Sequence, residues 1–360
     1  MSESSRRRFL SSTIAATATA ALSNSLEAAS GLRKIRVGQI GTKHAHAGGK
    51  MATFRKFPEL FEVVGVVEPD PERRKAVKDT PTYRGVPFLT EAELLKTDSL
   101  KAVAVETEIP QLLPTAHRCI DAGVHIHLDK PAGVSLPEFR RICAAADRKK
   151  LVIQMGYMFR SNAAFRFLFN AVRKGWLGDV FQVHCEMSKK VGDGTRRELA
   201  QYKGGSMFEL GCHLIDAVVT VLGKPDRVTP FLRNTRPDYD NLMDNCLAVF
   251  EYPKATASIR SSVSEVDGGR RRQFVACGTR GTIVIQPLEP HVLTLTLERD
   301  VEGYKRGTHT IELPPSTGRY DGDMTHLARA IQGLEESEYG TTHDLAVQES
   351  VLRASGMPVT

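Results

Sequence analysis

The sequence predicts an α/β protein with two domains: a doubly wound parallel sheet, followed by an α+β domain with an open, mostly antiparallel sheet. Three observations support this fold class. The chain has 360 residues, enough for two apolar cores of ordinary size. Strand-like and helix-like segments alternate as far as residue 156, as parallel βαβ units require. Beyond residue 227 most segments alternate apolar and polar residues, which is typical of antiparallel strands with one covered face.

The first domain is expected over residues 31–156. Within it, residues 101–106 form a run rich in Ala and Val, as expected for a strand that is covered on both faces. The expected strands are 34–41, 62–68, 86–89, 101–106, 124–128 and 151–155. The expected helices are 49–57, one that begins at Pro71, 114–122 and 136–149.

The second domain is expected over residues 157–360. Its predicted helices are 163–174, 207–222, 323–334 and 345–354. Its predicted strands are 180–188, 247–252, 255–263, 273–276, 282–286 and 292–298, and residues 191–205 are expected to form a loop. A sheet with one open face usually gains a partner, so we expect a homo-oligomer, either a dimer or a tetramer.

Residues 1–30 are expected to be an export signal. Arg6, Arg7 and Arg8 precede an apolar stretch rich in Ala and Thr, which ends in small residues. The paired arginines resemble a twin-arginine signal, which implies the twin-arginine machinery as a partner and a periplasmic or other extracytoplasmic location. That pathway moves folded proteins, so a cofactor would be loaded before export. An uncleaved membrane anchor is the alternative, although the stretch is short for a span of ~20 residues.

Composition argues against several kinds of partner. The net charge is +7, but the basic residues are spread along the chain without interleaved aromatics, so no nucleic-acid partner is expected. Six cysteines show no C-x-x-C spacing and predict neither a metal site nor a particular disulfide. The pairs His44/His46 and His125/His127 each offer two ligands on one face of an extended chain. A metal site needs three or four protein ligands, so no bound metal is predicted.

The first strand ends in a turn that suggests a dinucleotide. Gly41 matches the first glycine of the Rossmann G-x-G-x-x-G turn, but Lys43 and His46 replace the second and third, so the motif is weak. Glu68 ends the second strand, in the place of the acid that binds the adenosine ribose. This pattern favours NAD, and either Arg73 or Arg74 nearby would allow NADP. The cofactor-binding residues expected in the turn are Gly41, Thr42, Lys43 and His46.

Three further residues suggest proton and hydride chemistry. Lys130 follows the strand 124–128, and ligands bind beyond the carboxyl ends of strands in open α/β sheets. Glu209 and His213 are four residues apart, which places them on one face of a helix and within reach of each other. A histidine suits proton abstraction from a hydroxyl, and an ammonium can orient and polarise the hydroxyl oxygen.

Two motifs carry these residues and resemble a known family. AGVHIHLDKP at 122–131 is similar to the A-G-K-H-V-x-x-E-K-P signature of the Gfo/Idh/MocA oxidoreductases, and GGSMFELGCHLID at 204–216 is similar to their G-G-x-x-x-D-x-G-x-H-x-x-D helix. The resemblance implies an NAD(P)-dependent enzyme that oxidises a hydroxyl of a sugar, cyclitol or related polyol. It implies His213 as the base, Lys130 as the group that holds the hydroxyl, and Glu209 in the place of the family's aspartate.

The resemblance also suggests the remaining site residues. Thr107 stands where the family carries Thr-Pro-Asn, and Asp129 replaces the glutamate before the lysine, so both are expected beside the cofactor together with Lys130. The residues expected to line the substrate cleft, with Asp216 in a supporting role, are Tyr157, Arg160, Asn162 and Asp216.

Two other functions remain open at this point. One is an NAD-dependent glycosidase that oxidises a sugar transiently, cleaves the glycoside and reduces the sugar again. The other is a non-catalytic sugar-binding relative with a degenerate nucleotide site, which Lys43 and His46 in the glycine turn would explain.

Overall fold

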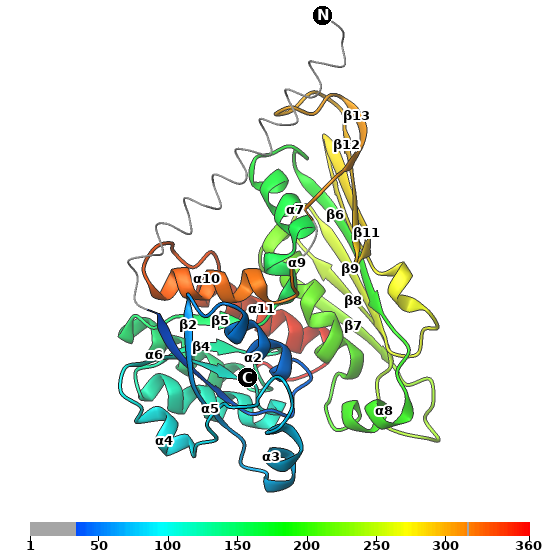
Figure 1. Cartoon of the computed structure of the whole chain (residues 1–360). Helices are drawn as coiled ribbons and strands as arrows, with labels where there is room; N and C mark the ends of the chain where they lie inside the picture. The colour runs from blue at the N-terminus through cyan, green and yellow to red at the C-terminus, as the bar shows by residue number, and fades with distance from the viewer. Residues whose placement is uncertain (1–33, 315–316) are drawn as a thin grey trace, which may run out of the picture.

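A computed structural model describes residues 34–314 and 317–360, and the expected export signal lies outside these ranges. Two sheets organise the chain, one parallel with five strands and one mostly antiparallel with eight, so the predicted fold class is confirmed (Figure 1). None of the helices in the described ranges is long and apolar enough to cross a bilayer.

The first sheet has the strand order β2-β1-β3-β4-β5, and all its pairings are parallel. Its strands are β1 (Ile35–Ile40), β2 (Phe61–Val67), β3 (Leu100–Val105), β4 (His125–Leu128) and β5 (Ile153–Met155). Because β1 pairs with β2 on one side and β3 on the other, the order reverses at β1, and ligands bind at such a switch point.

One predicted strand of this sheet is wrong. Residues 86–89 form only a single bridge between Val66 and Phe88. Pro87 has no N–H to donate, so the segment makes two backbone hydrogen bonds to Val66 and then leaves the sheet.

The first sheet is accompanied by α2 (Ala47–Lys56), α3 (Pro71–Val77), α4 (Glu91–Leu95), α5 (Ile109–Asp121) and α6 (Leu136–Lys149). Local signals set two of these starts. The carboxylate of Asp70 accepts hydrogen bonds from the N–H groups of Glu72 and Arg73, and the hydroxyl of Ser135 accepts one from Glu138 N–H. Helix α5 begins five residues earlier than the predicted 114–122, and α4 was not predicted.

The second sheet has the order β13-β12-β11-β10-β6-β9-β8-β7. Its strands are β6 (Val180–Ser188), β7 (Arg227–Arg233), β8 (Asn245–Glu251), β9 (Thr256–Ser262), β10 (Gln273–Gly278), β11 (Gly281–Leu288), β12 (His291–Leu297) and β13 (Gly307–Ile311). The two strands that sequence reasoning missed, β7 and β13, are the two edges. Edge strands bury little, so their apolar pattern is weak, and β7 carries Pro230 as edge strands can.

The helical segments of the second half are η1 (Met158–Ser161), α7 (Ala163–Arg173), α8 (Asp193–Leu199), η2 (Met207–Gly211), α9 (Cys212–Leu222), η3 (Gly268–Arg271), α10 (Asp321–Ile331) and α11 (Thr341–Ala354). Segment η2 is a π-helical turn, so the predicted helix 207–222 is in fact two joined segments. The short α8 lies within the predicted loop 191–205.

Helix α10 lies against the first sheet although it is close to the chain's end (Figure 1). Met324 and Leu327 of α10 pack with Ile35 and Val37 of β1 and with Phe54 of α2. A segment near the end of the sequence therefore completes the core of the first domain.

Candidate active site

The candidate site lies at the carboxyl edge of the first sheet, where this edge meets the second sheet's helices. Gly41 follows β1, Thr107 follows β3 and Lys130 follows β4. Segment η2 supplies Glu209 and the start of α9 supplies His213. The two halves of the chain thus contribute to one site, as the resemblance implied.

Gly41 makes the sharp turn after β1. Its φ is +93°, and a Cβ at this position would lie 2.5 Å from the backbone oxygen of Glu106. No other residue fits that turn without moving β3. Thr107 lies next to it, and its buried hydroxyl has no hydrogen-bond partner among the described residues. A tight glycine turn beside an unsatisfied hydroxyl fits a dinucleotide crossing this edge.

Glu68 organises the turn from inside. Its Oε2 accepts hydrogen bonds from the N–H of Thr42 at 3.0 Å and from the Thr42 hydroxyl at 2.6 Å. Its Oε1 accepts one from the N–H of Asp70. Arg73 also reaches the turn, donating to the Thr42 hydroxyl at 3.2 Å and to its carbonyl. The Glu68 carboxylate is therefore buried and already hydrogen-bonded to Thr42 and Asp70, whereas the partly buried Arg73 guanidinium binds the hydroxyl and carbonyl of Thr42.

Lys130 is buried and paired across the domain boundary. Its ammonium lies 2.7 Å from Oε1 of Glu209 and 2.7 Å from the Glu209 backbone oxygen. The Lys130 side chain is 1% exposed and that of Glu209 is 22% exposed. Burial alone would lower the pKa of Lys130, but the Glu209 carboxylate raises it above the ordinary value, so the ammonium keeps its charge.

His213 is enclosed by rings. Its imidazole lies edge-on to Tyr157, with centroids 6.1 Å apart, and to Phe159, at 5.9 Å, while His46 lies at 6.5 Å. Burial, together with the charge of Lys130, holds the pKa of His213 well below its ordinary value. The ring is therefore neutral at neutral pH and can accept a proton. Its Nδ1 has no hydrogen-bond partner in the described part of the chain.

The expected contact between Glu209 and His213 is not among the hydrogen bonds of the described residues, because Glu209 turns to Lys130 instead. Glu209 lies on the π-helical turn at 207–211, and both its carboxylate and its backbone oxygen accept hydrogen bonds from the Lys130 ammonium.

Asp129 is fully buried and lies between two histidines. Nδ1 of His46 is 3.2 Å from Oδ1 of Asp129, and Nδ1 of His44 contacts its Oδ2. The same Oδ1 accepts a hydrogen bond from the N–H of Lys130 at 2.9 Å. His46, expected beside the cofactor, thus belongs to a cluster around the residue that precedes the candidate catalytic lysine.

A cavity of about 380 Å³ adjoins these groups. Lys43, Arg73 and Lys189 supply cations to its wall, Lys43 being 3.0 Å from Asp70. The cavity's other lining residues are His44, Ala45, Glu108, Ile109, Thr195, Glu198, Leu199, Gln201, Tyr202 and Glu209. The wall between the glycine turn and α8 thus carries three cations and three carboxylates, and the cations beside the turn can meet the phosphates of a dinucleotide.

The residues expected to line a substrate cleft mostly have internal partners. Arg160 donates to Asp216 at 2.6 Å and to Asp344 at 2.6 Å, and all three are buried. Asn162 caps α7 by accepting from Ala164 N–H. Of this group, Tyr157 alone lies against the His213 ring.

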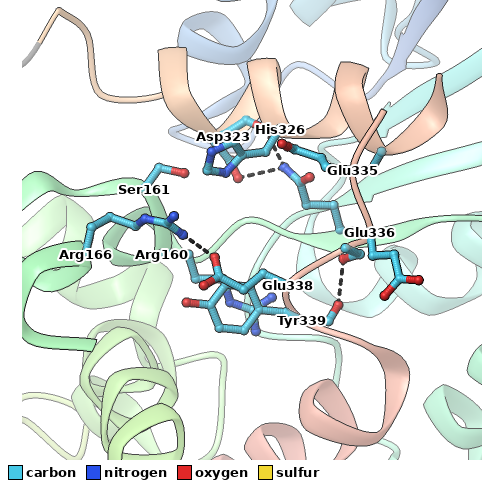
Figure 2. Close-up of a pocket in the computed structure, with 12 residues that line it drawn as sticks. Arg160, Ser161, Arg166, Asp323, His326, Glu335, Glu336, Glu338 and Tyr339 are labelled. Carbon is cyan, nitrogen blue, oxygen red and sulfur yellow. Dashed lines mark hydrogen bonds and ion pairs between the residues drawn. The ribbon is translucent and has the colours of Figure 1, made fainter. Parts of the chain in front are cut away.

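Arg160 also lines a second cavity, of about 500 Å³. Figure 2 shows Arg160, Arg166 and Tyr339 grouped near Glu338, with Asp323 and His326 of α10 opposite. No residue is shared between the walls of the two cavities.

Sequence reasoning missed a buried polar network beneath the site. Nζ of Lys50 lies 2.9 Å from Nε2 of His127 and 3.2 Å from Oδ2 of Asp323, and His127 lies 3.5 Å from the buried Glu106. In the sequence, His127 stands out only as half of an H-x-H pair. Lys50 and Asp323 carried no signal, because they are 273 positions apart and meet only through the packing of α10.

Comparison with known proteins agrees with this geometry. Residues 35–157 match the oxidoreductase family with an NAD-binding Rossmann fold, and residues 165–284 match the GFO/IDH/MocA C-terminal domain. The uncharacterized oxidoreductase YdgJ of Escherichia coli is 26% identical over 88% of this chain and 94% of its own. D-xylose 1-dehydrogenase (NADP(+)) 2 of Haloferax volcanii is 26% identical over 77% of this chain and 89% of its own.

A solved structure has the same fold. Levoglucosan dehydrogenase, in complex with NADH and levoglucosan, superposes with a TM-score of 0.77 at 15% identity, covering 90% of this chain and 98% of that one. Together the two matched domains span most of the described residues, in the order that the fold shows. The chain belongs to the Gfo/Idh/MocA family of oxidoreductases, with an NAD-binding Rossmann domain first and the family's C-terminal domain second.

Proposed function

We propose that the chain is an NAD(P)-dependent dehydrogenase that oxidises a secondary hydroxyl of a sugar, cyclitol or related polyol. The observation that carries this proposal is the placement of Lys130, Glu209 and His213 at the carboxyl edge of the first sheet, beside the cavity that follows the glycine turn. Named relatives agree, since levoglucosan dehydrogenase and D-xylose 1-dehydrogenase both act on sugars.

In this proposal His213 is the general base. Nδ1 of His213 has no partner among the described residues and can face the hydroxyl, and burial lowers the pKa of the ring, which keeps it unprotonated before the reaction. Lys130 orients the hydroxyl oxygen with its ammonium, and Glu209 keeps that ammonium charged and in place. A bound nicotinamide would supply the hydride acceptor, so that oxidation of the alcohol would yield a ketone and NAD(P)H, with the hydroxyl proton on His213.

The residues expected at the adenosine ribose should allow both NAD and NADP to bind. Glu68, the expected ribose acid, is committed to Thr42 and Asp70, whereas Arg73 lines the cavity. A guanidinium there can neutralise a 2′-phosphate, so NADP should bind as well as NAD. In Arg73→Ala, the Kd for NADP should rise about tenfold while that for NAD changes little, because one charged hydrogen bond is worth about 1.5 kcal/mol.

We further propose that the folded enzyme is exported by the twin-arginine pathway to the periplasm and that it works as a homo-oligomer. The arginine-rich start of the sequence supports the first point. The second is supported by exposed apolar side chains on strands of the second sheet, among them Phe181 of β6, Leu247 of β8 and Val292 of β12.

The proposed function is tested by denaturing purified protein and assaying the supernatant for NAD(H) and NADP(H), followed by a screen of sugars and cyclitols for nicotinamide reduction. Bound nucleotide and reduction with at least one polyol are expected. Release of an aglycone from a glycoside without net reduction would instead favour the transient-oxidation glycosidase. Absence of bound nucleotide and of any response to added NAD(P) would leave a non-catalytic sugar binder.

A further inference from the structure

His44, His46 and Asp129 form a cluster whose side-chain atoms are close enough together to bind one metal ion. One ligand atom from each residue lies within 4.8 Å of the other two. The two histidines come from the turn after β1 and the aspartate from the end of β4, so the cluster exists only in the folded sheet. We propose that these three residues bind a divalent transition-metal ion beside the candidate active site.

The spacing of the donor atoms suits such an ion. Ligands about 2.0–2.1 Å from a zinc ion lie about 3.3 Å apart in a tetrahedron. Nδ1 of His46 and Oδ1 of Asp129 are 3.2 Å apart, so this pair already has the required separation. Nδ1 of His44 lies closer to the carboxylate than that, and its ring would move outward to admit the ion.

The donor types indicate which ions the site would select. Two imidazole nitrogens with one carboxylate are the ligands of zinc and of other first-row divalent ions, whereas calcium and magnesium prefer oxygen. Three protein ligands leave at least one coordination position open, as in catalytic rather than structural sites.

The surroundings can tolerate the charge of an ion. Asp129 supplies a carboxylate to the cluster, and the ammonium of the adjacent Lys130 is already paired with Glu209 at 2.7 Å. Asp129 is also held in place by the N–H of Lys130, a fixed backbone donor of the kind that orients metal ligands. His44 also lines the 380 Å³ cavity, so an ion can reach the cluster from it.

The position of the cluster suggests its role, and this step rests on the proposed function. The ring of His46 lies 6.5 Å from that of His213, the proposed base. An ion at the cluster would bind and polarise the substrate hydroxyl next to the base that takes its proton. This would also explain why histidine replaces the third glycine of the turn: the position supplies a ligand in addition to a bend.

Titration with Zn²⁺ alone tests the site. The full chain is stripped with EDTA, dialysed and titrated calorimetrically, and we expect one ion per chain with a Kd in the micromolar range or tighter. His46→Ala and Asp129→Asn should each weaken binding about a hundredfold or more, because even partners of ligands contribute 10- to 100-fold. His117→Ala is the matched control, since it removes an exposed histidine 3.5 Å from the carboxylate of Asp121 without touching the cluster.

Co²⁺ provides a second readout that separates the cluster from the six cysteines. The Co²⁺-loaded chain should show the visible bands of nitrogen and oxygen ligands and no thiolate charge-transfer band. Circular dichroism of each variant checks that it is folded. Unchanged Zn²⁺ binding in both folded variants, a thiolate band, or no binding by the stripped parent would overturn the proposal.

The metal site and the dehydrogenase can fail separately. Nucleotide binding is measured by fluorescence titration of the stripped chain with NADH and NADPH. Full polyol oxidation without metal would overturn the ion's role in catalysis and leave the dehydrogenase intact. Stoichiometric Zn²⁺ binding at the cluster in a chain that binds no nucleotide would support the site while removing the proposed function.

Discussion

The ammonium of Lys130 lies 2.7 Å from Oε1 of Glu209, so a residue at a strand end of the first sheet and a residue of the second domain share one buried ion pair. This pair holds the Lys130 ammonium at the boundary between the two domains. It also directs the Glu209 carboxylate towards Lys130 instead of His213. The site's geometry therefore depends on the two domains keeping their relative positions.

Glu209→Gln should destabilise the protein by about 3 kcal/mol, because it leaves the buried charge of Lys130 without a counterion. Urea unfolding followed by fluorescence measures the change. Asp300→Asn, which removes the partner of the exposed Lys305, serves as the control and should leave the midpoint unchanged. Equal midpoints for Glu209→Gln and the parent chain would show that the pair is not needed for stability.

Lys130→Ala should lower kcat by at least about a hundredfold while the Kd for NAD(P)H stays within a factor of a few, because the ammonium acts on the hydroxyl and not on the nucleotide. Steady-state kinetics with an accepted polyol and a separate fluorescence titration give the two numbers. Full turnover in this variant would refute the role proposed for Lys130. A parallel loss of nucleotide binding would instead indicate a collapsed cleft.

Gly41→Ala and Gly48→Ala add the same methyl group at two nearby positions, one in the turn after β1 and one in α2. Gly41 has φ +93° and its Cβ would meet the Glu106 backbone at 2.5 Å, so alanine should cost about 2 kcal/mol or more. A Cβ at Gly48, inside α2, meets nothing within 4 Å, and alanine there should raise stability by about 0.5 kcal/mol. Thermal melts compare the two, and the same shift in both would contradict the backbone argument.

Asp216 and Asp344 share Arg160 and should have opposite effects on acid stability. Burial opposes ionisation of both, but the charge of Arg160 lowers the pKa of Asp216, whereas burial prevails at Asp344 and raises its pKa. The contribution of Asp216 is present above its unfolded pKa, near 4, and is lost as the pH falls below that value. Asp344 binds its proton more readily when folded, so its contribution grows as the pH falls.

Asp216→Asn should therefore flatten the decline in the free energy of unfolding below about pH 4. Asp344→Asn should remove the gain in stability that the parent chain shows as the pH falls towards about 4 from above, so the slope above pH 4 changes in the opposite direction. Urea unfolding at a series of pH values gives both slopes. Slopes that change in the same direction would show that the two carboxylates do not differ in this way.

Replacing both Arg6 and Arg7 by lysine should keep the protein in the cytoplasm, because the export receptor reads the arginine pair. Cell fractionation and N-terminal sequencing in a bacterium with this pathway provide the measurement, with the parent chain as the control. Periplasmic recovery of the twin-lysine variant at the parent's level would contradict this route of export.

The sequence by itself determined the order of the domains and most elements. Helix α6 and strand β6 have the predicted bounds, because a cap at Ser135 and a long apolar strand pattern are local signals. The placement of Lys130 after a strand was equally local. Local signals did not predict three other features, because these depend on what packs beside them. They are the single bridge within residues 86–89, the π-helical turn at 207–211 and the edge strands β7 and β13.

Only the tertiary structure decided which side chains meet. The 83 positions between His46 and Asp129 and the 273 between Lys50 and Asp323 carry no periodic pattern, and these contacts form because parallel strands bring distant loops to one edge and α10 returns to the first sheet. Hydrophobic periodicity reports which face of an element is buried, but it does not report the partner that covers that face.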